Sequence, residues 1–194
     1  MSGEKNIFDA GIPEMHMPTE HVHRIEIKIK KVGQLFNSFD PSPFLEKDLD
    51  DNAFEYIVSS VSEHPLKTKQ KIVIYFPKNQ AKKISELEIR RAIHNYFEYK
   101  KILAERNIRL KLKEGQLSFV VGITFLVSCL AIGEYIINLA TNTFTYIIFE
   151  GLLIGGWVAM WKPISDILYE WWPTYQEKRI YKKISEMDIE FKYE

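Results

Sequence analysis

Two long apolar runs lie close together in the last third of this chain. The first covers residues 117–138 and the second covers residues 144–161, and neither contains lysine or arginine. At ~1.5 Å per residue, each run is long enough to cross a hydrocarbon layer of ~30 Å as a helix. A core helix of a soluble protein rarely stays apolar on every face over such a length. The pattern therefore predicts an integral membrane protein with a transmembrane helical hairpin over residues 116–162.

The charges around the hairpin predict its orientation. Lysines and arginines flank it on both sides, and the short connection between the two runs carries no charge. Basic residues collect on the cytoplasmic side of a membrane. We therefore expect a two-pass protein with both termini in the cytoplasm. The first residues contain no apolar signal-peptide core, so the first run would itself direct insertion.

Composition narrows the function classes. The chain has 194 residues, with 26 basic and 26 acidic side chains and no net charge, which argues against a nucleic-acid partner. The single cysteine, Cys129, lies within the first apolar run, so a disulfide framework and a cysteine-based zinc site are excluded. We expect Cys129 to be a small packing residue that faces lipid or a neighbouring helix. The residues outside the hairpin, ~150 of them, suffice for one small soluble domain.

Three segments outside the hairpin have the pattern of strands. Residues 22–32 and 189–193 alternate between apolar and charged side chains, which is typical of half-buried strands. Residues 71–76 are continuously apolar or aromatic after Lys71, which predicts a strand covered on both faces. The last strand should return to the sheet that residues 22–32 begin, with Lys28 and Lys30 facing Glu190 and Glu194.

Helices should lie between these strands. Asn52 with Glu55, and Ser85 with Glu88, have the spacing of capping boxes and predict helices that end near residues 63 and 113. Residues 108–113 also alternate strictly, so a strand remains an alternative there, and Gly115 is a plausible joint before the membrane.

After the hairpin, Pro163 should interrupt the chain. An amphipathic helix over residues 163–172 is expected to lie in the plane of the membrane interface, ending at Pro173. Four tryptophans would serve as interfacial anchors: Trp157, Trp161, Trp171 and Trp172.

The predicted fold is therefore an α+β soluble domain, with about three strands plus helices, interrupted by a two-helix transmembrane insertion. The expected divisions are a flexible tail (1–21), the first part of the cytoplasmic domain (22–115), the hairpin (116–162, with spans near 117–138 and 144–161), the interfacial helix (163–172) and a C-terminal helix and strand that return to the domain (173–194).

Two acidic residues lie inside the apolar runs. Glu134 and Glu150 lie roughly 10 and 13 Å, respectively, from the middle of the turn between the runs, and no lysine or arginine lies at that depth. An ionisable side chain within a span is a functional candidate. The carboxyls can be protonated, can line an ion path in an oligomer, or can hydrogen-bond to polar side chains near the turn. An assembly contact is a further interpretation.

Small residues in the two runs predict close helix packing, because glycines and serines four positions apart let helix backbones approach each other. Packing within the hairpin and packing between subunits both fit this pattern. The residues concerned are Ser118, Gly122, Gly151, Gly155 and Gly156.

Two further groups have weaker patterns. His16, His21 and His23 are candidate metal ligands, but their spacing matches no specific site, and we expect no metal or cofactor. Phe36, Phe39 and Phe44 lie in a proline-containing loop that is either a lid over the sheet or an exposed docking loop, with the lid favoured.

The sequence contains no catalytic motif, so we expect no enzymatic activity. The leading hypothesis is a homo-oligomeric membrane scaffold or anchor that binds the lipid bilayer and docks a cytoplasmic protein partner. The alternative is an oligomeric ion or proton channel, or transport component, that uses Glu134 and Glu150.

Overall fold

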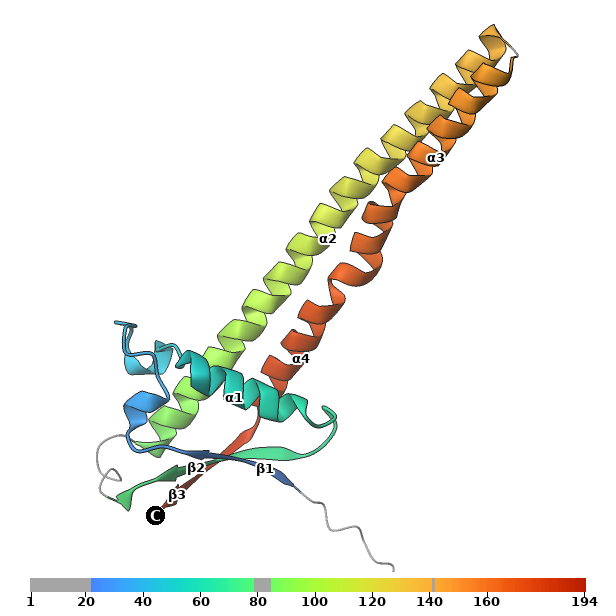
Figure 1. The fold of residues 1–194 in the computed structure, drawn as a ribbon. Coiled ribbons are helices and arrows are strands. Elements are labelled where there is room, and N and C mark those ends of the chain that lie inside the picture. Colours follow the sequence, from blue (N-terminus) through green and yellow to red (C-terminus); the bar gives the residue numbers. More distant parts are fainter. Residues whose placement is uncertain (1–21, 79–84, 141) are drawn as a thin grey trace, which may run out of the picture.

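The chain forms a small sheet domain from which a long helical hairpin projects (Figure 1). The computed structural model describes residues 22–78, 85–140 and 142–194. The elements in chain order are β1 (His23–Lys28), η1 (Val32–Gln34), η2 (Phe44–Glu46), α1 (Asp51–Ser62), β2 (Gln70–Phe76), α2 (Glu86–Leu139), α3 (Thr143–Ser165), η4 (Asp166–Glu170), α4 (Trp172–Ser185) and β3 (Asp188–Tyr193).

The sheet has three parallel strands in the order β1-β2-β3. Ile72 at its centre stands opposite Ile25 on one side and Ile189 on the other. The last strand therefore returns to the sheet as expected, but it pairs with β2 and not with β1. A continuously apolar strand is most stable in the middle of a sheet, where both of its edges are hydrogen-bonded, and this explains the central place of β2.

Only one face of the sheet is covered by helices. Ile72, Ile74 and Phe76 of β2 belong to the buried core, which lies between the sheet and α1, α2 and α4 (Figure 1). Lys71, Val73 and Tyr75 point to the other face, and no helix in the described part of the chain covers them. Val73 is nevertheless fully buried, so the prediction that both faces of this strand are covered is confirmed at Val73, whereas Lys71 and Tyr75 stay partly exposed.

Charged side chains lie across this outer face. Lys28 forms an ion pair with Glu194 at 2.5 Å, and Lys71 forms one with Glu190 at 2.6 Å. The contact between Lys28 and Glu194 was expected from the charge pattern, although β2 lies between the two strands. Lys30 has no ion pair in the described part of the chain.

Helix α2 starts where its capping residues predict, whereas α1 starts slightly earlier than predicted. Ser85 and Glu88 form the expected capping box at the start of α2. The cap of α1 is Asp50, whose side chain accepts a hydrogen bond from the backbone N–H of Asn52, so this helix begins before the expected position. An aspartate at this place also interacts favourably with the positive end of the helix dipole.

Helix α2 runs without interruption from the sheet domain to the tip of the hairpin. It has 54 residues, which corresponds to a length of about 80 Å. Residues 108–113 are helical, so the alternative of a strand is excluded there, and no joint occurs at Gly115.

The return path is also straighter than expected. Helix α3 continues through Pro163 to Ser165, and a π-helix, η4, follows it directly. The separate helix predicted for residues 163–172 is therefore not formed. Pro163 lacks only one backbone donor, and a wider π-turn next to a proline accommodates the local disturbance. Pro173 lies in the first turn of α4, where proline is tolerated.

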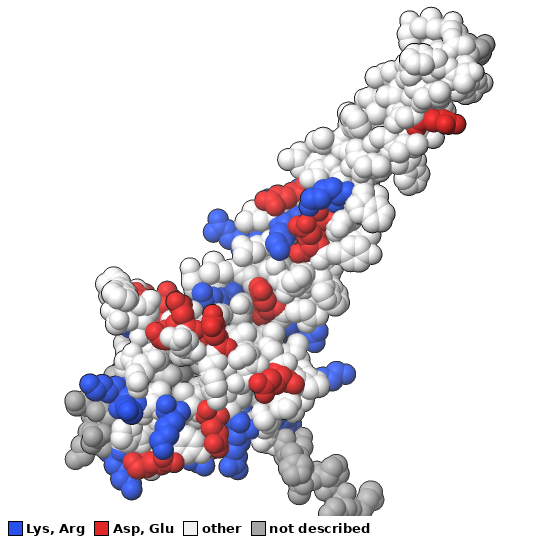
Figure 2. Space-filling model, in the orientation of Figure 1, with Lys and Arg blue, Asp and Glu red and all other residues white. Residues whose placement is uncertain are grey.

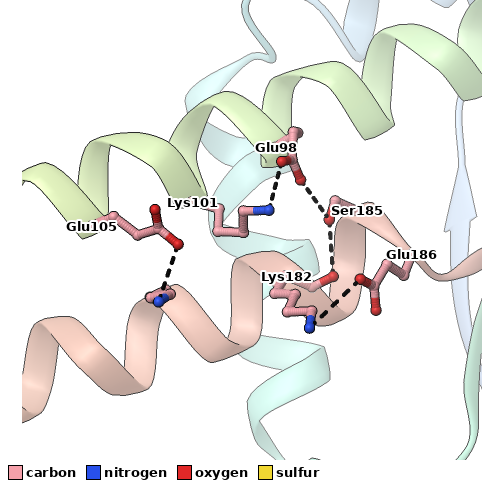
Figure 3. Close-up of polar contacts among 7 residues, drawn as sticks. Glu98, Lys101, Glu105, Lys182, Ser185 and Glu186 are labelled. Atoms are coloured by element: carbon pink, nitrogen blue, oxygen red, sulfur yellow. Dashed lines mark hydrogen bonds and ion pairs between the residues drawn. The ribbon is translucent and has the colours of Figure 1, made fainter.

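Below the apolar part of the hairpin, α2 and α4 form a stalk. The Lys178 ammonium lies 3.1 Å from the Glu105 carboxylate, and the Ser185 hydroxyl donates to Glu98 at 3.4 Å (Figure 3). About 25 Å of α2 separate the buried Phe97 of the core from Glu114, where the apolar part begins. The stalk thus holds the sheet domain away from the apolar helices.

Candidate functional site: the surface of the helical hairpin

The seam between α2 and α3 is made of small residues. A Cβ added at Gly156 would lie 2.7 Å from Leu126 Cδ1, and one added at Gly122 would lie 3.0 Å from the Met160 sulfur. The two helices approach this closely because these positions carry no side chain. Gly122 and Gly156 therefore serve packing within the hairpin, which was one of the two interpretations of the small residues.

The other predicted small residues lie elsewhere. A Cβ added at Gly151 or Gly155 would meet nothing within 4 Å, so both glycines face away from α2. Ser118 is half-buried. Of the predicted packing set, the structure brings together only Gly122 and Gly156 in the seam.

Three further small residues of α2 pack against the returning helices: Gly115, Cys129 and Gly133, all of which are buried. Cys129 was predicted to be a packing residue, whereas sequence reasoning missed Gly133 in the seam and Gly115, which lies against Ile167 of η4. A signal for Gly115 and Cys129 exists in the sequence. Gly115, Gly122 and Cys129 recur seven positions apart, which is the repeat of two helices that wrap closely around each other. Cys129 is accordingly a packing residue, with its Cβ 3.5 Å from the position that a Cβ at Gly156 would take.

Glu134 and Glu150 lie on the same flank of the hairpin. Gly133 faces Phe149 across the seam, and each glutamate follows one member of this facing pair. One residue corresponds to a rotation of ~100° about a helix axis. Because α2 and α3 are antiparallel, the two rotations carry both glutamates to the same side at nearly the same height. Figure 2 shows one acidic patch on the otherwise white outer part of the arm, and Glu134 and Glu150 are the only acidic residues in the sequence from 117 to 161.

Both glutamates are exposed, and neither carboxylate has a hydrogen bond or ion pair to another residue in the described part of the chain. The interpretation that they hydrogen-bond to polar side chains near the turn finds no such bond among the described residues, and Thr141 at the turn lies outside them. Thr145, for example, is engaged in the cap of α3, where its backbone N–H donates to Asn142 Oδ1 at 3.0 Å. The two carboxylates are thus available to water, to a cation or to another chain.

A belt of charged residues borders the apolar part of the hairpin on the side of the sheet domain (Figure 2). Lys162 lies 2.5 Å from Asp166 and 2.9 Å from Glu170. The Lys111 ammonium donates to the backbone carbonyl of Glu170 at 3.2 Å, which ties α2 to the π-helix. This belt marks the point at which the outer surface changes from apolar to polar.

The tryptophans lie around and above this belt. Trp157 and Trp161 are exposed on α3, at 67% and 80% of their surface. Trp171 is half-buried, and its indole N–H donates to the carbonyl of Ile167 at 2.9 Å. Trp172 packs edge-on against Trp171, with ring centroids 5.7 Å apart.

The histidine cluster is described only in part. His16 and His21 lie outside the described residues, and His23 packs its ring against His64 with centroids 4.0 Å apart. The described ranges contain no group of three or more His, Cys, Asp or Glu side chains placed to hold a metal ion.

Two helices of the chain are long and apolar enough to cross a membrane, Glu86–Leu139 and the continuous helical stretch Thr143–Ser185. No protein-family model, curated protein or solved structure matches the chain.

Proposed function

We propose that this protein is a two-pass integral membrane protein that assembles with copies of itself and acts as a membrane scaffold. The observation that carries the proposal is the exposure of the apolar helices. In each of the two helices, only 17% of the most apolar 18-residue stretch is buried inside the protein. A core helix of a soluble protein would be mostly buried, whereas lipid accounts for a helix that is apolar on its outer surface.

The way in which the hairpin joins the domain supports a scaffold. Helix α2 supplies core residues such as Ile93 and Phe97, and α4 leads directly into β3 of the same sheet. Both arms of the hairpin are therefore parts of the domain, which would be held at a fixed distance and orientation from the membrane. Such an arrangement suits the presentation of a surface to a cytoplasmic protein partner, and the proposal includes no enzymatic activity.

The membrane assignment has a direct test. The protein should sediment with membranes and should need detergent to become soluble and monodisperse. A folded, monodisperse protein in the supernatant of a detergent-free ultracentrifugation would contradict the proposal.

The orientation is tested by cysteine labelling in intact cells. The basic residues on both sides of the hairpin support the proposal that both termini lie in the cytoplasm. Asn142→Cys, at the tip, should react with an impermeant thiol reagent from outside, whereas Ser2→Cys should not. Cys129 is buried in the seam, so the unsubstituted protein serves as the control. The reverse labelling pattern would overturn the proposed topology.

One observation favours the alternative of an ion or proton path. Glu134 and Glu150 share one flank and one level, and no lysine or arginine of the apolar helices lies near enough to neutralise them. An uncompensated carboxylate facing lipid costs several kcal/mol, by an order-of-magnitude estimate. Two helices cannot enclose a pore, so this function would need several copies with the glutamate flanks turned inward.

Flux measurements in liposomes separate the two functions. Under the alternative, Glu134→Gln with Glu150→Gln abolishes flux while the assembly keeps its size, and Glu114→Gln at the charged belt leaves flux unchanged. A reconstituted assembly that conducts nothing would eliminate the alternative and leave the scaffold.

A further inference from the structure

The loop before α1 carries the most exposed aromatic side chain of the domain. Phe39 is 94% exposed, while its neighbours Phe36 and Phe44 pack towards the core. The loop therefore combines the two predicted roles, because it is a lid at Phe36 and Phe44 and a projection at Phe39. An isolated exposed phenylalanine at a loop tip is the kind of side chain that fills a pocket in a partner.

Hydrogen bonds within this loop fix the projection. The backbone N–H of Phe39 donates to Asn37 Oδ1 at 2.9 Å. The Asp40 carboxylate accepts from the backbone N–H of Ser42 at 2.9 Å and from that of Asp48 at 2.7 Å. Because the loop is already ordered, docking Phe39 would lose little conformational entropy.

Acidic side chains lie beside the loop that carries Phe39, although one of them, Glu98, forms an ion pair with Lys101 at 2.5 Å. A groove between this loop and α2 is lined by acidic side chains and by no lysine or arginine. Its acidic lining residues are Asp40, Glu46, Asp48 and Glu98. We call Phe39 together with these four residues the knob.

A groove of the opposite charge lies at the other end of α1. Its apolar lining consists of Val22, Leu66 and Met187, and its exposed rim carries Lys67, Arg179 and Lys182. Two acidic residues, Glu186 and Asp188, also line it, and Glu186 lies 3.9 Å from Lys182, but basic residues outnumber acidic ones in the lining. Gln70 also lines it; this side chain is buried, and its Oε1 accepts no hydrogen bond in the described part of the chain. We call this groove the socket.

The knob and the socket are placed to meet on neighbouring copies. Phe39 of the knob comes before the first residue of α1, and Leu66 and Lys67 of the socket come after its last. The helix between them has 12 residues and is about 18 Å long. Figure 1 shows α1 lying across the long axis of the hairpin. If the hairpins of two copies stand parallel in one membrane, the knob end of one domain faces the socket end of the next.

We propose that copies of this protein associate head to tail, with Phe39 of one sheet domain inserted into the socket of its neighbour. The inference rests on the proposed two-pass topology, which gives all copies the same orientation. The apolar lining receives the phenylalanine ring, and the basic rim meets the acidic residues of the knob. Because the contact joins two different surfaces, repeating it around the membrane normal closes a ring or extends a row.

The test measures particle mass in detergent across a range of protein concentrations. Phe39→Ser should weaken association roughly 10-fold or more, as expected for a buried aromatic at the centre of a contact. Lys67→Glu with Arg179→Glu should weaken it as well, and the wild-type contact should weaken as salt is raised. Leu87→Ser and Lys30→Glu, which change an exposed apolar residue and an exposed lysine elsewhere on the domain, should leave it unchanged. The melting temperature of Phe39→Ser should match that of the wild type, because its side chain is almost fully exposed.

Mixing the variants tests the head-to-tail geometry. The Phe39→Ser chain keeps its socket, and the Lys67→Glu, Arg179→Glu chain keeps its Phe39. An equimolar mixture should therefore form dimers and nothing larger. An assembly that is unchanged by Phe39→Ser would overturn this inference and leave the hairpin as the site of assembly. A wild-type particle that is monomeric at every concentration would instead overturn the proposed homo-oligomer itself, and with it this contact.

Discussion

Gly133 lies directly against the ring of Phe149, where a Cβ on the glycine would come within 2.7 Å of Cδ2. This contact fixes the rotation of α2 relative to α3 near the tip. It thereby decides which side chains point outward, including the two glutamates that follow these residues in the chain.

The seam predicts a sharp difference between glycines of α3. Gly156→Leu should destabilise the hairpin by about 1–3 kcal/mol, because the added side chain overlaps Leu126 and lies against Cys129. Gly155→Leu should change stability little, since its neighbourhood is open. The rate at which maleimide modifies Cys129 during a denaturing detergent titration reports the opening of the seam. Equal rates for the two variants would contradict the assigned helix rotation.

The C-terminal strand should be essential to the domain. Ile189 is fully buried, so Ile189→Ala should cost about 2–5 kcal/mol of unfolding free energy. Arg24→Ala, on the exposed side of β1, should cost less than about 0.5 kcal/mol. Urea unfolding, together with hydrogen exchange of the amides in β2, measures both. If the β2 amide hydrogens still exchange slowly after removal of residues 188–194, then β3 is dispensable for the domain.

The Phe39 loop should respond to acid. Hydrogen bonds from the backbone of Asp48 and from Ser42 lower the pKa of Asp40 to about 2. An aspartate in an unfolded chain has a pKa of about 3.9. Because the folded value is the lower one, the carboxylate stabilises the loop fully above that unfolded value, and this contribution is lost as the pH falls from about 4 to about 2.

Asp40→Asn should therefore loosen the loop at neutral pH and remove its response between about pH 4 and pH 2. The amide resonances of Ser42 and Asp48 report the change in an NMR titration. Glu55→Gln, on the exposed side of α1, should leave those resonances and their titration as in the wild type. An Asp40→Asn loop that still titrates in this range would assign the response to a different carboxyl.

Local patterns in the sequence predicted the elements better than their arrangement. The alternation in residues 22–32 and 189–193 and the capping pair Ser85 and Glu88 identified two strands and a helix start, since each depends on neighbouring residues alone. The alternation in residues 108–113 was misleading, because the same spacing also fits a helix that is exposed on most of its surface. The order of the strands depends on crossovers over one face of the sheet, and no local pattern encodes it.

The candidate site shows the same limit. Glu134 and Glu150 are found readily, since an acidic residue in an apolar run is conspicuous. That they share a flank depends on the rotation of both helices, which the contact between Gly133 and Phe149 fixes and which no local pattern of the sequence gives. The four-residue spacing of Gly151 and Gly155 also predicts close packing, but the spacing alone does not distinguish a partner within the hairpin from one in another subunit. Both glycines face away from α2, so packing within the hairpin does not involve them.

The position of β3 after the hairpin also bears on how the protein is made. During translation, β1 and β2 leave the ribosome first, and β2 then has one open edge until the residues of β3 arrive. Those residues emerge only after both apolar helices have been synthesised. Completion of the sheet is therefore a late event in biogenesis, and a nascent chain arrested within the hairpin would present an unpaired strand edge for chaperones to bind.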